Sequence, residues 1–490
     1  MKKMTVLLLA ILVCVFFVSC NEATDESKAS VSFDPDAPNL PSPDEVNIGG
    51  EFVILVSGNS SRNDFSADET AEKPVDIAIY QRNEAIKQKY GVEILTKDVT
   101  GFGTTTGKGV GPGYNMIAND YISATGKYGA ALIGTYDVAT LAYNRFLQDM
   151  NQIPYIDLSN EYWDQKANAD LSINGKMYYT TGDIGVTDNV MTHAILFNKD
   201  MCKEYKIDEP YALVNEGKWT LEKYSELVKK VGRDANDDGI YDSNDIYGLM
   251  TWNDPMIAIL ASSGEKIATI NKDGFLELSL YNPRVVNLYD MYEDLVFDMS
   301  HVYNYQYDNT TGKASPQGSW DTARDSVFSS GRALFYMNLL EVVERHRDSD
   351  VDFGVLPYPK FNETQENYGH AVSAYHTNFL CVPIVTGDYT RSGIVLEELA
   401  YQGKKLLTPA YYDQTLVGRG VRDQDSVAML DIIFASRVFD VGQYYNVGTY
   451  KDQLANLFTT RIPFTSLYET YRSQAESKIE SINELMQGVR

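Results

Sequence analysis

The stretch that decides the fold lies between residues 174 and 252. Residues 174–208 read NGKMYYTTGDIGVTDNVMTHAILFNKDMCKEYKID, and residues 217–252 read GKWTLEKYSELVKKVGRDANDDGIYDSNDIYGLMTW. The run 194–197 is short and wholly apolar, which is typical of a buried parallel strand. Asn198 and Asp200 follow it, and both residue types favour turns.

A helix is predicted in the second part of this stretch. Thr220 is placed to cap it, because a threonine oxygen accepts a backbone amide of the first helical turn. Trp219, at the helix start, is expected to be a packing residue, and Gly232 ends the helix. Apolar residues recur at close to 3.6 positions, at Leu221, Tyr224, Leu227, Val228 and Val231.

The order and spacing of these pieces resemble the extracellular solute-binding proteins that supply ABC importers, in the group that binds sugars. That family often carries a dGkxYxxP turn, an alxYNkdlf strand and exit, a TWdel helix start and a DxxGxxYG loop. Residues 174–178, 194–201, 219–221 and 238–248 stand in those places, and 328–335 and 352–360 resemble two further family segments. Phe197 replaces the usual Tyr, and Trp219-Thr220 reverses the family's order.

Strands and helices alternate along much of the chain, which predicts α/β architecture with a parallel or mixed sheet covered on both faces. A chain of 490 residues is too long for one core. The resemblance implies a two-lobed periplasmic-binding-protein type II fold with a cleft between the lobes. It places the first lobe at 45–190 plus 375–408 and the second at 191–374 plus 409–490, with crossings near 184–193, 370–378 and 405–412.

The N-terminus is predicted to be a targeting segment. Lys2 and Lys3 precede an apolar run at 5–18, and Ser19 stands before Cys20. Residues 1–20 resemble a bacterial lipoprotein signal peptide, which implies that Cys20 is lipidated and anchors the protein at the outer face of the membrane or in the periplasm. The alternative is an uncleaved membrane anchor, for which the run is short. Residues 21–48 are acidic and rich in Pro and Ser, and they predict a flexible tether.

Composition narrows the choice of partner. The net charge of −26 disfavours nucleic acid and anionic membrane surfaces, which require basic patches. Beyond the leader, Cys202 and Cys381 are too few for a disulfide framework and are expected to be buried free thiols. The five histidines form no HExxH spacing and there is no GxSxG elbow, so we expect no enzyme. Carboxylates are plentiful, however, and a glycosidase pair stays open.

The loop DANDDGIYDSND at 234–245 predicts a calcium site. Oxygen-bearing side chains fall at loop positions 1, 3, 5, 9 and 12, with glycine at position 6, as calcium loops require. The expected ligands are Asp234, Asn236, Asp238, the Ile240 carbonyl, Asp242 and Asp245. The loop resembles the dockerin form, with Asp at the last position, and the ion is expected to be structural. The alternative is a solvated acidic turn.

The ligand site is predicted from two rules. Sugars present apolar faces ringed by hydroxyls, so their sites combine aromatic rings with polar side chains. In α/β lobes, ligands bind at the carboxyl ends of strands. The expected binding residues are Asn59, Tyr136, Asp137, Asp183, Trp252, Trp320, Asn338, Tyr375 and His376. Each has a structural alternative, such as a core position for Trp252 or a helix cap for Asp137 and Asp183.

The functional hypothesis is a lipid-anchored, monomeric substrate-binding protein of an ABC importer. It would hold a carbohydrate, expected to be an oligosaccharide, in the cleft and deliver it to the permease subunits. The alternatives are a secreted glycoside hydrolase or lyase and a surface sugar sensor or adhesin without a transporter.

Overall fold

The first of two main sheets is five-stranded. The computed structural model describes residue 34 and residues 37–58, 63–101, 110–306, 320–421 and 423–488, without the side chains of 320–324, 414, 415 and 419. The strand order is β2-β1-β3-β14-β4. The strands are β1 (Gly50–Gly58), β2 (Val92–Thr100), β3 (Ala130–Gly134), β14 (Asn378–Cys381) and β4 (Tyr179–Thr180). The first three are parallel, and β14 runs antiparallel to β3 and to β4.

Helices cover both faces of this sheet. They are α1 (Pro74–Tyr90), α2 (Pro112–Ser123), α3 (Thr135–Tyr143), α4 (Gln165–Leu171) and α13 (Tyr389–Pro409), with a 3-10 turn, η1, at Met150–Gln152. Ile54 and its face of the sheet pack with Ile86 of α1 and Leu396 of α13. Leu55 faces the other way, toward Val138 of α3. Alternate residues of one strand therefore enter separate cores, as strand geometry requires.

The second sheet has six strands in the order β10-β7-β11-β5-β12, with β6 paired to β7. They are β5 (His193–Asn198), β6 (Gly232–Arg233), β7 (Ile246–Thr251), β10 (Val302–Asn304), β11 (Ala333–Leu339) and β12 (Phe353–Leu356). Residues 193–198 are buried throughout. The apolar run at 194–197 is therefore confirmed as a buried strand, although β5 pairs antiparallel with both neighbours.

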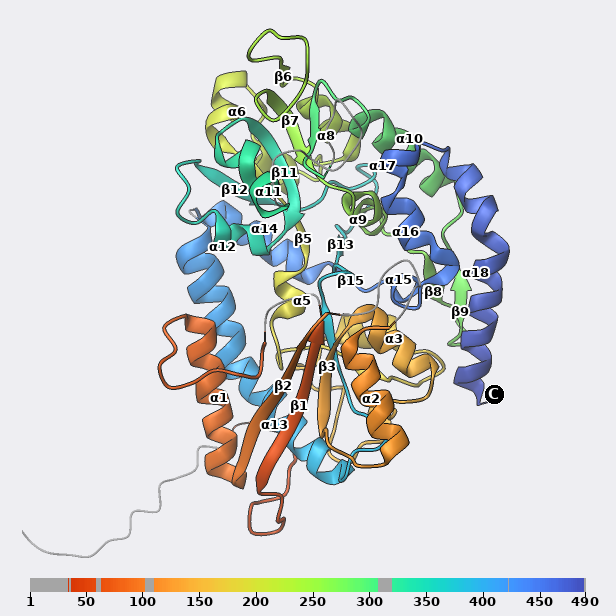
Figure 1. The fold of residues 1–490 in the computed structure, drawn as a ribbon. Coiled ribbons are helices and arrows are strands. Elements are labelled where there is room, and N and C mark those ends of the chain that lie inside the picture. Colours follow the sequence, from red (N-terminus) through yellow and green to blue (C-terminus); the bar gives the residue numbers. More distant parts are fainter. Residues whose placement is uncertain are drawn as a thin grey trace, which may run out of the picture. The chain divides into compact units, whose positions relative to one another are not determined.

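Helices also cover the second sheet (Figure 1). They are α6 (Lys199–Tyr205), α7 (Pro210–Asn215), α8 (Leu221–Val228), α9 (Pro255–Ser262), α10 (Pro283–Val296), α11 (Trp320–Ser329), α12 (Glu341–Arg345) and α14 (Gln424–Ala435). Thr220 caps α8 as predicted, because its side chain accepts the Lys223 amide. Trp219 is fully buried and its Nε1 donates to the Pro357 carbonyl at 2.8 Å, which confirms its packing role.

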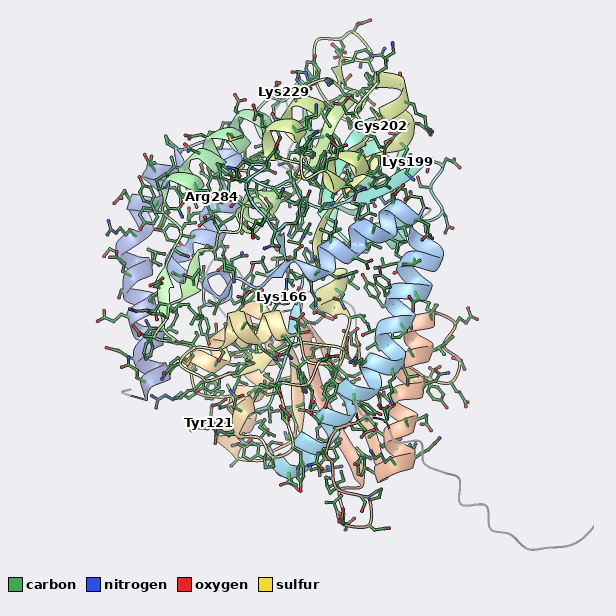
Figure 2. The ribbon with its side chains drawn as sticks, turned by 180° about the vertical axis from the view of Figure 1, so that it is seen from behind. Tyr121, Lys166, Lys199, Cys202, Lys229 and Arg284 are labelled. Carbon is green, nitrogen blue, oxygen red and sulfur yellow. The ribbon has the colours of Figure 1, made fainter. Side chains whose placement is uncertain are left out.

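Three segments join the regions of the two sheets. The chain passes between β4 and β5 through α5 (Thr187–Val190), and between β12 and β14 through β13 (His370–Ala371). The third passage is the end of α13, which continues into the π-helical turn η2 (Ala410–Gly420). α13 packs along α1, whereas η2 reaches α12 beside the second sheet. Figure 2 shows α13 crossing the back of the molecule between the two sheet regions.

The C-terminal part of the chain forms a helical layer. It contains β15 (Arg437–Val438), α15 (Val441–Tyr444), η3 (Val447–Thr449), α16 (Tyr450–Ala455), α17 (Leu457–Thr460) and α18 (Phe464–Gln487). β15 pairs in parallel with β13, and α18 packs on the hairpin of β8 (Ala268–Ile270) and β9 (Leu276–Leu278).

Three helix boundaries differ from what the sequence pattern predicts. The pattern after Gly134 predicts a helix to about Met150, but α3 ends at Tyr143, because the chain turns through Arg145 at φ +61°. Ser466 and Glu469 predict a capping box at the start of the last helix, but Ser466 lies inside α18, which begins at Phe464 after Pro463. Asp425 is the predicted cap of α14, but the cap is Asp423, whose side chain accepts the Ser426 amide. In each case a neighbouring residue offers a cap or turn that the periodicity alone does not reveal.

Two expectations about the rest of the chain have different outcomes. Both cysteines are free thiols, and Cys381 is buried as predicted, whereas Cys202 is only half-buried. Cys20 and most of the predicted tether lie outside the described residues. Among the described residues, no helix combines the length and apolarity needed to cross a membrane. Residues 38–490 belong to one compact unit.

Candidate functional site

A cavity of about 480 Å³ lies where several elements of both sheet regions meet. One wall comes from Tyr136 of α3, beside the first sheet. A second wall comes from His193 of β5 and from the start of α9 with Asp254. The floor is the crossing segment 371–375, and the last wall is the C-terminal segment. The residues that line it are Tyr136, His193, Asp254, Ile257, Ala258, Ala371, Val372, Ser373, Ala374, Tyr375, Gln443, Asn446, Thr449, Lys451, Asp452, Gln453, Ala455 and Asn456.

An aromatic stack lies behind the His193 wall. The rings of Trp252 and His193 are 6.2 Å apart and nearly parallel, and Tyr305 stacks on Trp252 at 6.3 Å. Burial lowers the pKa of His193 to about 3, so its imidazole is neutral at physiological pH. A stack of this kind fixes the wall with flat, rigid groups and adds no charge to the cavity.

Three of the described residues that line the cavity are charged. Lys451 is buried, and its Nζ lies 3.1 Å from Oδ1 of Asp452 and 4.0 Å from the ring centre of Tyr136. Asp254 precedes α9 at the N-cap position, yet its side chain makes no capping hydrogen bond. Burial raises the pKa of Asp254 to about 7, and Lys451 opposes the rise. The Lys451–Tyr136 contact joins the C-terminal segment to the helix beside the first sheet.

The turn at 446–449 has strained backbone. Asn446 has φ +51° and Thr449 has φ +57°, a region that a β-branched residue rarely adopts. Gly448, at φ +59°, lies so close to α18 that a Cβ there would be 2.7 Å from the Cβ of Ala475. Oδ1 of Asn446 and Oγ1 of Thr449 are buried and have no hydrogen-bond partner among the described residues. Strain and unpaired polar atoms of this kind gather at ligand sites.

Two of the predicted binding residues line this cavity. Tyr136 and Tyr375 are among its lining residues. Trp252 lies one layer behind, 7% exposed, and contacts the His376 ring at 5.9 Å. His376 in turn lies 4.8 Å from the ring of Tyr375. The structure therefore brings four of the predicted residues together, two at the cavity surface and two beneath it.

The other predicted binding residues lie elsewhere. Asp137 is buried and its carboxylate accepts the Gly111 amide at 3.1 Å. Asp183 accepts the Thr408 hydroxyl at 2.6 Å. Asn338 is buried and donates to the Tyr336 hydroxyl. Asn59 lies outside the described residues, as does the side chain of Trp320, the first residue of α11.

The loop at 234–245 turns on itself through Asp237 and Gly239, both at positive φ. Asp234 accepts the Gly239 amide at 2.7 Å, and Asp238 accepts the Ile240 amide at 2.8 Å. Asp245 is buried and accepts amides of Ala235 and Asp242. Within the described residues, no three Asp, Glu, His or Cys side chains converge as a metal centre. The expected ligands also include the Asn236 side chain and the Ile240 carbonyl, and calcium at this loop stays a prediction.

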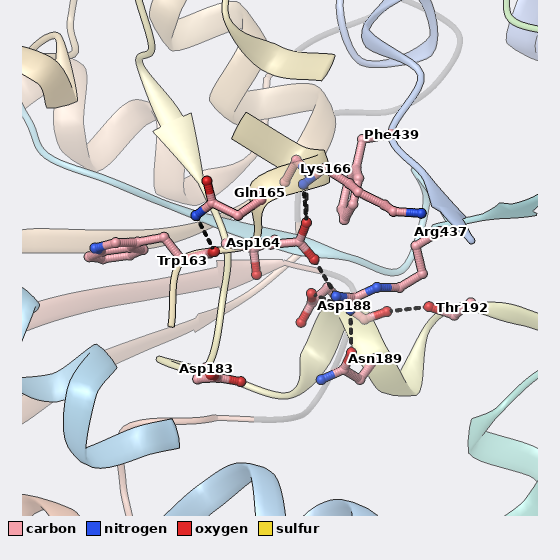
Figure 3. A network of polar contacts seen from close by, with 12 residues as sticks. Trp163, Asp164, Gln165, Lys166, Asp183, Asp188, Asn189, Thr192, Arg437 and Phe439 are labelled. Atoms are coloured by element: carbon pink, nitrogen blue, oxygen red, sulfur yellow. Dashed lines mark hydrogen bonds and ion pairs between the residues drawn. The ribbon is translucent and has the colours of Figure 1, made fainter. Parts of the chain in front are cut away.

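The crossing segments are tied by a buried polar network around Arg437 (Figure 3). Its guanidinium donates to Asp188 at 2.8 Å and, on the same side, to Asn189. The other terminal nitrogen pairs with Asp164, the N-cap residue of α4. Asp183, also labelled in Figure 3, stands apart from these contacts. The network joins α5, β15 and α4, which come from three distant parts of the sequence.

A second tie runs beside this network. Lys166 of α4, labelled in Figure 2, donates to the carbonyl of Ala435. Asp170, one turn further along α4, accepts the Phe439 amide at 3.1 Å and the ammonium group of Lys266 at 2.5 Å. The region of the first sheet is thus held to the C-terminal segment next to the cavity.

Sequence reasoning missed the C-terminal wall. Gln443, Asn446, Thr449, Lys451, Asp452, Gln453 and Asn456 all line the cavity, and none was predicted. The rule used for the prediction selects residues after strands, whereas this segment consists of short helices and turns. The sequence does contain one relevant signal. Polar residues stand between the buried Tyr444, Val447, Tyr450 and Leu454, which recur every three or four positions.

Comparisons with known proteins show what the fold is. No family model and no curated protein sequence matches the chain. Among solved structures, it is similar to the maltose/maltodextrin-binding domain MalE of Bdellovibrio bacteriovorus bound to maltotriose, with TM-score 0.54, 13% identity and coverage of 88% of this chain and 100% of that one.

Two further solved structures are similar to the chain over most of its length. The galacto-N-biose-/lacto-N-biose I-binding protein of the Bifidobacterium longum ABC transporter, in complex with lacto-N-biose, gives TM-score 0.56, 12% identity, and coverage of 88% and 97%. The cyclic alpha-maltosyl-1,6-maltose binding protein of Arthrobacter globiformis gives TM-score 0.56, 10% identity, and coverage of 88% and 99%. Over most of its length, the chain therefore has the two-lobed α/β fold of the sugar-binding solute-binding proteins of ABC transporters.

Proposed function

We propose that this protein is the substrate-binding component of an ABC importer and binds a carbohydrate in the cavity between its lobes. One observation carries the proposal: a cavity of about 480 Å³ takes its walls from the regions of both sheets and from a crossing segment. A ligand held there contacts both lobes at once. It therefore favours the closed state to the extent that it binds that state more tightly.

The chemistry of the lining supports a sugar. Tyr136 and Tyr375 offer rings to the apolar faces of a sugar, and Gln443, Asn446 and Thr449 offer groups to its hydroxyls. Two of the solved structures reported above were determined with maltotriose and with lacto-N-biose, which supports an oligosaccharide here. The similar solved structures are named as sugar-binding proteins, which favours binding over catalysis here.

The proposal extends to the setting in the cell. We infer that Cys20 carries a lipid, that the tether following it holds the lobes at the outer membrane face or in the periplasm, and that permease subunits receive the ligand from a monomer. The resemblance of residues 1–20 to a lipoprotein signal supports the anchor. Labelling of cells with a lipid precursor, comparing wild type with Cys20→Ala, tests it.

We also propose that calcium binds the loop at 234–245. A carboxylate has about four acceptor positions, so Asp234 and Asp238 keep acceptor capacity beyond the backbone amides that they hold. Binding would draw these oxygens together around the ion, in a structural role away from the cavity.

The deciding experiment is a thermal-shift screen of the mature chain against neutral oligosaccharides, followed by calorimetry on those that stabilise it. A substrate-binding protein is stabilised in proportion to ligand concentration and leaves the sugar intact. Release of reducing ends from the same sugars would support the hydrolase instead. An absence of stabilisation by every sugar tested would contradict carbohydrate binding.

A further inference from the structure

We propose that the cavity discriminates by charge: it accepts uncharged or cationic glycans and rejects anionic ones, with Asp254 as the residue that decides. This inference rests on the proposed function and names the ligand class for the same cavity. It follows from how the charged groups of the lining are paired.

Asp254 is the charged residue of the described lining that has no direct contact partner, although the charge of Lys451 lies near enough to favour its ionised form. Its carboxylate forms no hydrogen bond or ion pair with any described residue, and its side chain does not cap α9. The group nevertheless lines the cavity and is partly buried. A carboxylate that is removed from bulk water is satisfied by hydrogen-bond donors, and the hydroxyl or ammonium groups of a ligand supply them.

Lys451 is the one cation among the described lining residues, and it is already engaged. Its ammonium group lies 3.1 Å from the Asp452 carboxylate and over the face of Tyr136 at 4.0 Å. The side chain is 2% exposed. A ligand carboxylate or sulfate would therefore have to displace Asp452 to reach it. Recognition of an acidic sugar would call for an available Arg or Lys, because bidentate or point-charge pairing holds such groups.

The remaining titratable groups of the lining add no positive charge. His193 is neutral because burial lowers its pKa to about 3. Tyr136 and Tyr375 are phenols, which cannot carry a positive charge. With Asp254 and Asp452 set against Lys451, the described lining carries a net charge of −1 when Asp254 is ionised. Like charges brought together in a desolvated site are strongly disfavoured, so an anionic ligand is repelled.

The test measures affinity for matched probes by calorimetry. The probes are maltotriose and cellotriose, each compared with its derivative oxidised to carboxylates at C6 and its derivative with amines at C6. The proteins are wild type, Asp254→Asn and Asp290→Asn. The last removes the same charge from an exposed position of α10. Asn and Asp have the same shape, so both variants are expected to fold.

We expect wild type to bind the oxidised probe at least about tenfold more weakly than the parent sugar at pH 8, and the amine probe no more weakly than the parent. Asp254→Asn should bring the oxidised and parent probes to within about threefold, while Asp290→Asn keeps the wild-type ratio. An oxidised probe that binds wild type as tightly as its parent overturns the inference, as does an unchanged ratio in Asp254→Asn. Binding of no probe at all, neutral or charged, overturns the proposed function and the inference with it.

Discussion

The guanidinium of Arg437 lies 2.8 Å from the Oδ2 atom of Asp188 in a site where the two side chains are 13% and 2% exposed. The same guanidinium also pairs with Asp164. One arginine thus compensates two buried carboxylates at the place where the chain crosses between the lobes.

Replacing Arg437 by Met should destabilise the protein by about 3–5 kcal/mol, because it leaves two buried carboxylates without a countercharge. The free energy of unfolding from urea titration measures the effect. Arg437→Met combined with Asp188→Asn should recover part of the loss, since one of the uncompensated charges is removed. Arg472→Met is the control, because Arg472 pairs with Glu476 on the exposed face of α18, and it should leave the urea midpoint unchanged. A loss in Arg437→Met no larger than in the control would contradict the assignment.

Thr449→Val should separate binding from stability. The threonine hydroxyl is buried without a partner among the described residues, so its removal should change the free energy of unfolding by less than about 1 kcal/mol. Affinity for the sugar that stabilises wild type best should fall about tenfold, which is typical of one lost hydrogen bond to a ligand hydroxyl. Thr449→Ser keeps the hydroxyl and should keep the affinity. Equal affinities for the Val and Ser variants would rule out a direct role for this hydroxyl.

Stability should depend on pH through Asp254. Burial raises its pKa from the usual value of about 3.9 to about 7, so the native state holds a proton that the unfolded chain has released. This contribution to stability is complete below about pH 3.9 and is lost as the pH rises through about 7. The unfolding free energy of wild type should therefore fall more between pH 5 and pH 8 than that of Asp254→Asn. Asp188, whose pKa burial also raises to about 7, is present in both proteins. Parallel pH profiles for the two proteins would contradict the raised pKa of Asp254.

Calcium should raise the melting temperature by a few degrees at concentrations far above its dissociation constant, and a chelator should reverse the rise. The double variant Asp234→Asn, Asp238→Asn should melt at the same temperature with and without calcium, because it removes two of the expected ligands. Its matched control is Asp290→Asn, Asp294→Asn, which removes two acidic charges from α10 outside the loop. If calcium leaves the melting temperature of the wild-type protein unchanged, the loop is an ordinary acidic turn.

The sequence predicted local structure correctly where the deciding interaction spans only a few residues. Residues 194–197 form a strand because four apolar residues in a row are satisfied only when both faces are covered. Thr220 caps α8 because its oxygen reaches an amide three residues away. Asp425 and Ser466 were misread because Asp423 and Pro463, two or three residues earlier, begin the helices instead.

The residues that line the cavity were predicted only in part, and helix α3 shows why. Tyr136 and Asp137 are adjacent, and the rule of strand ends selects both equally. On a helix, however, neighbouring side chains point about 100° apart, so Tyr136 lines the cavity while Asp137 turns inward to hold the Gly111 amide. Periodicity along one element does not reveal which of its faces meets another element.

The sequence by itself determined the order of strands and helices, the alternation that makes two covered sheets, and the family whose fold the chain has, because these depend on short-range patterns and their spacing. Only the tertiary structure decided where the ligand cavity lies and what lines it. Tyr136, Asp254 and Lys451 are separated by more than a hundred residues at each step, and their meeting depends on how the C-terminal segment packs between the lobes. Contacts of that range are set by the packing of whole elements, which no local pattern records.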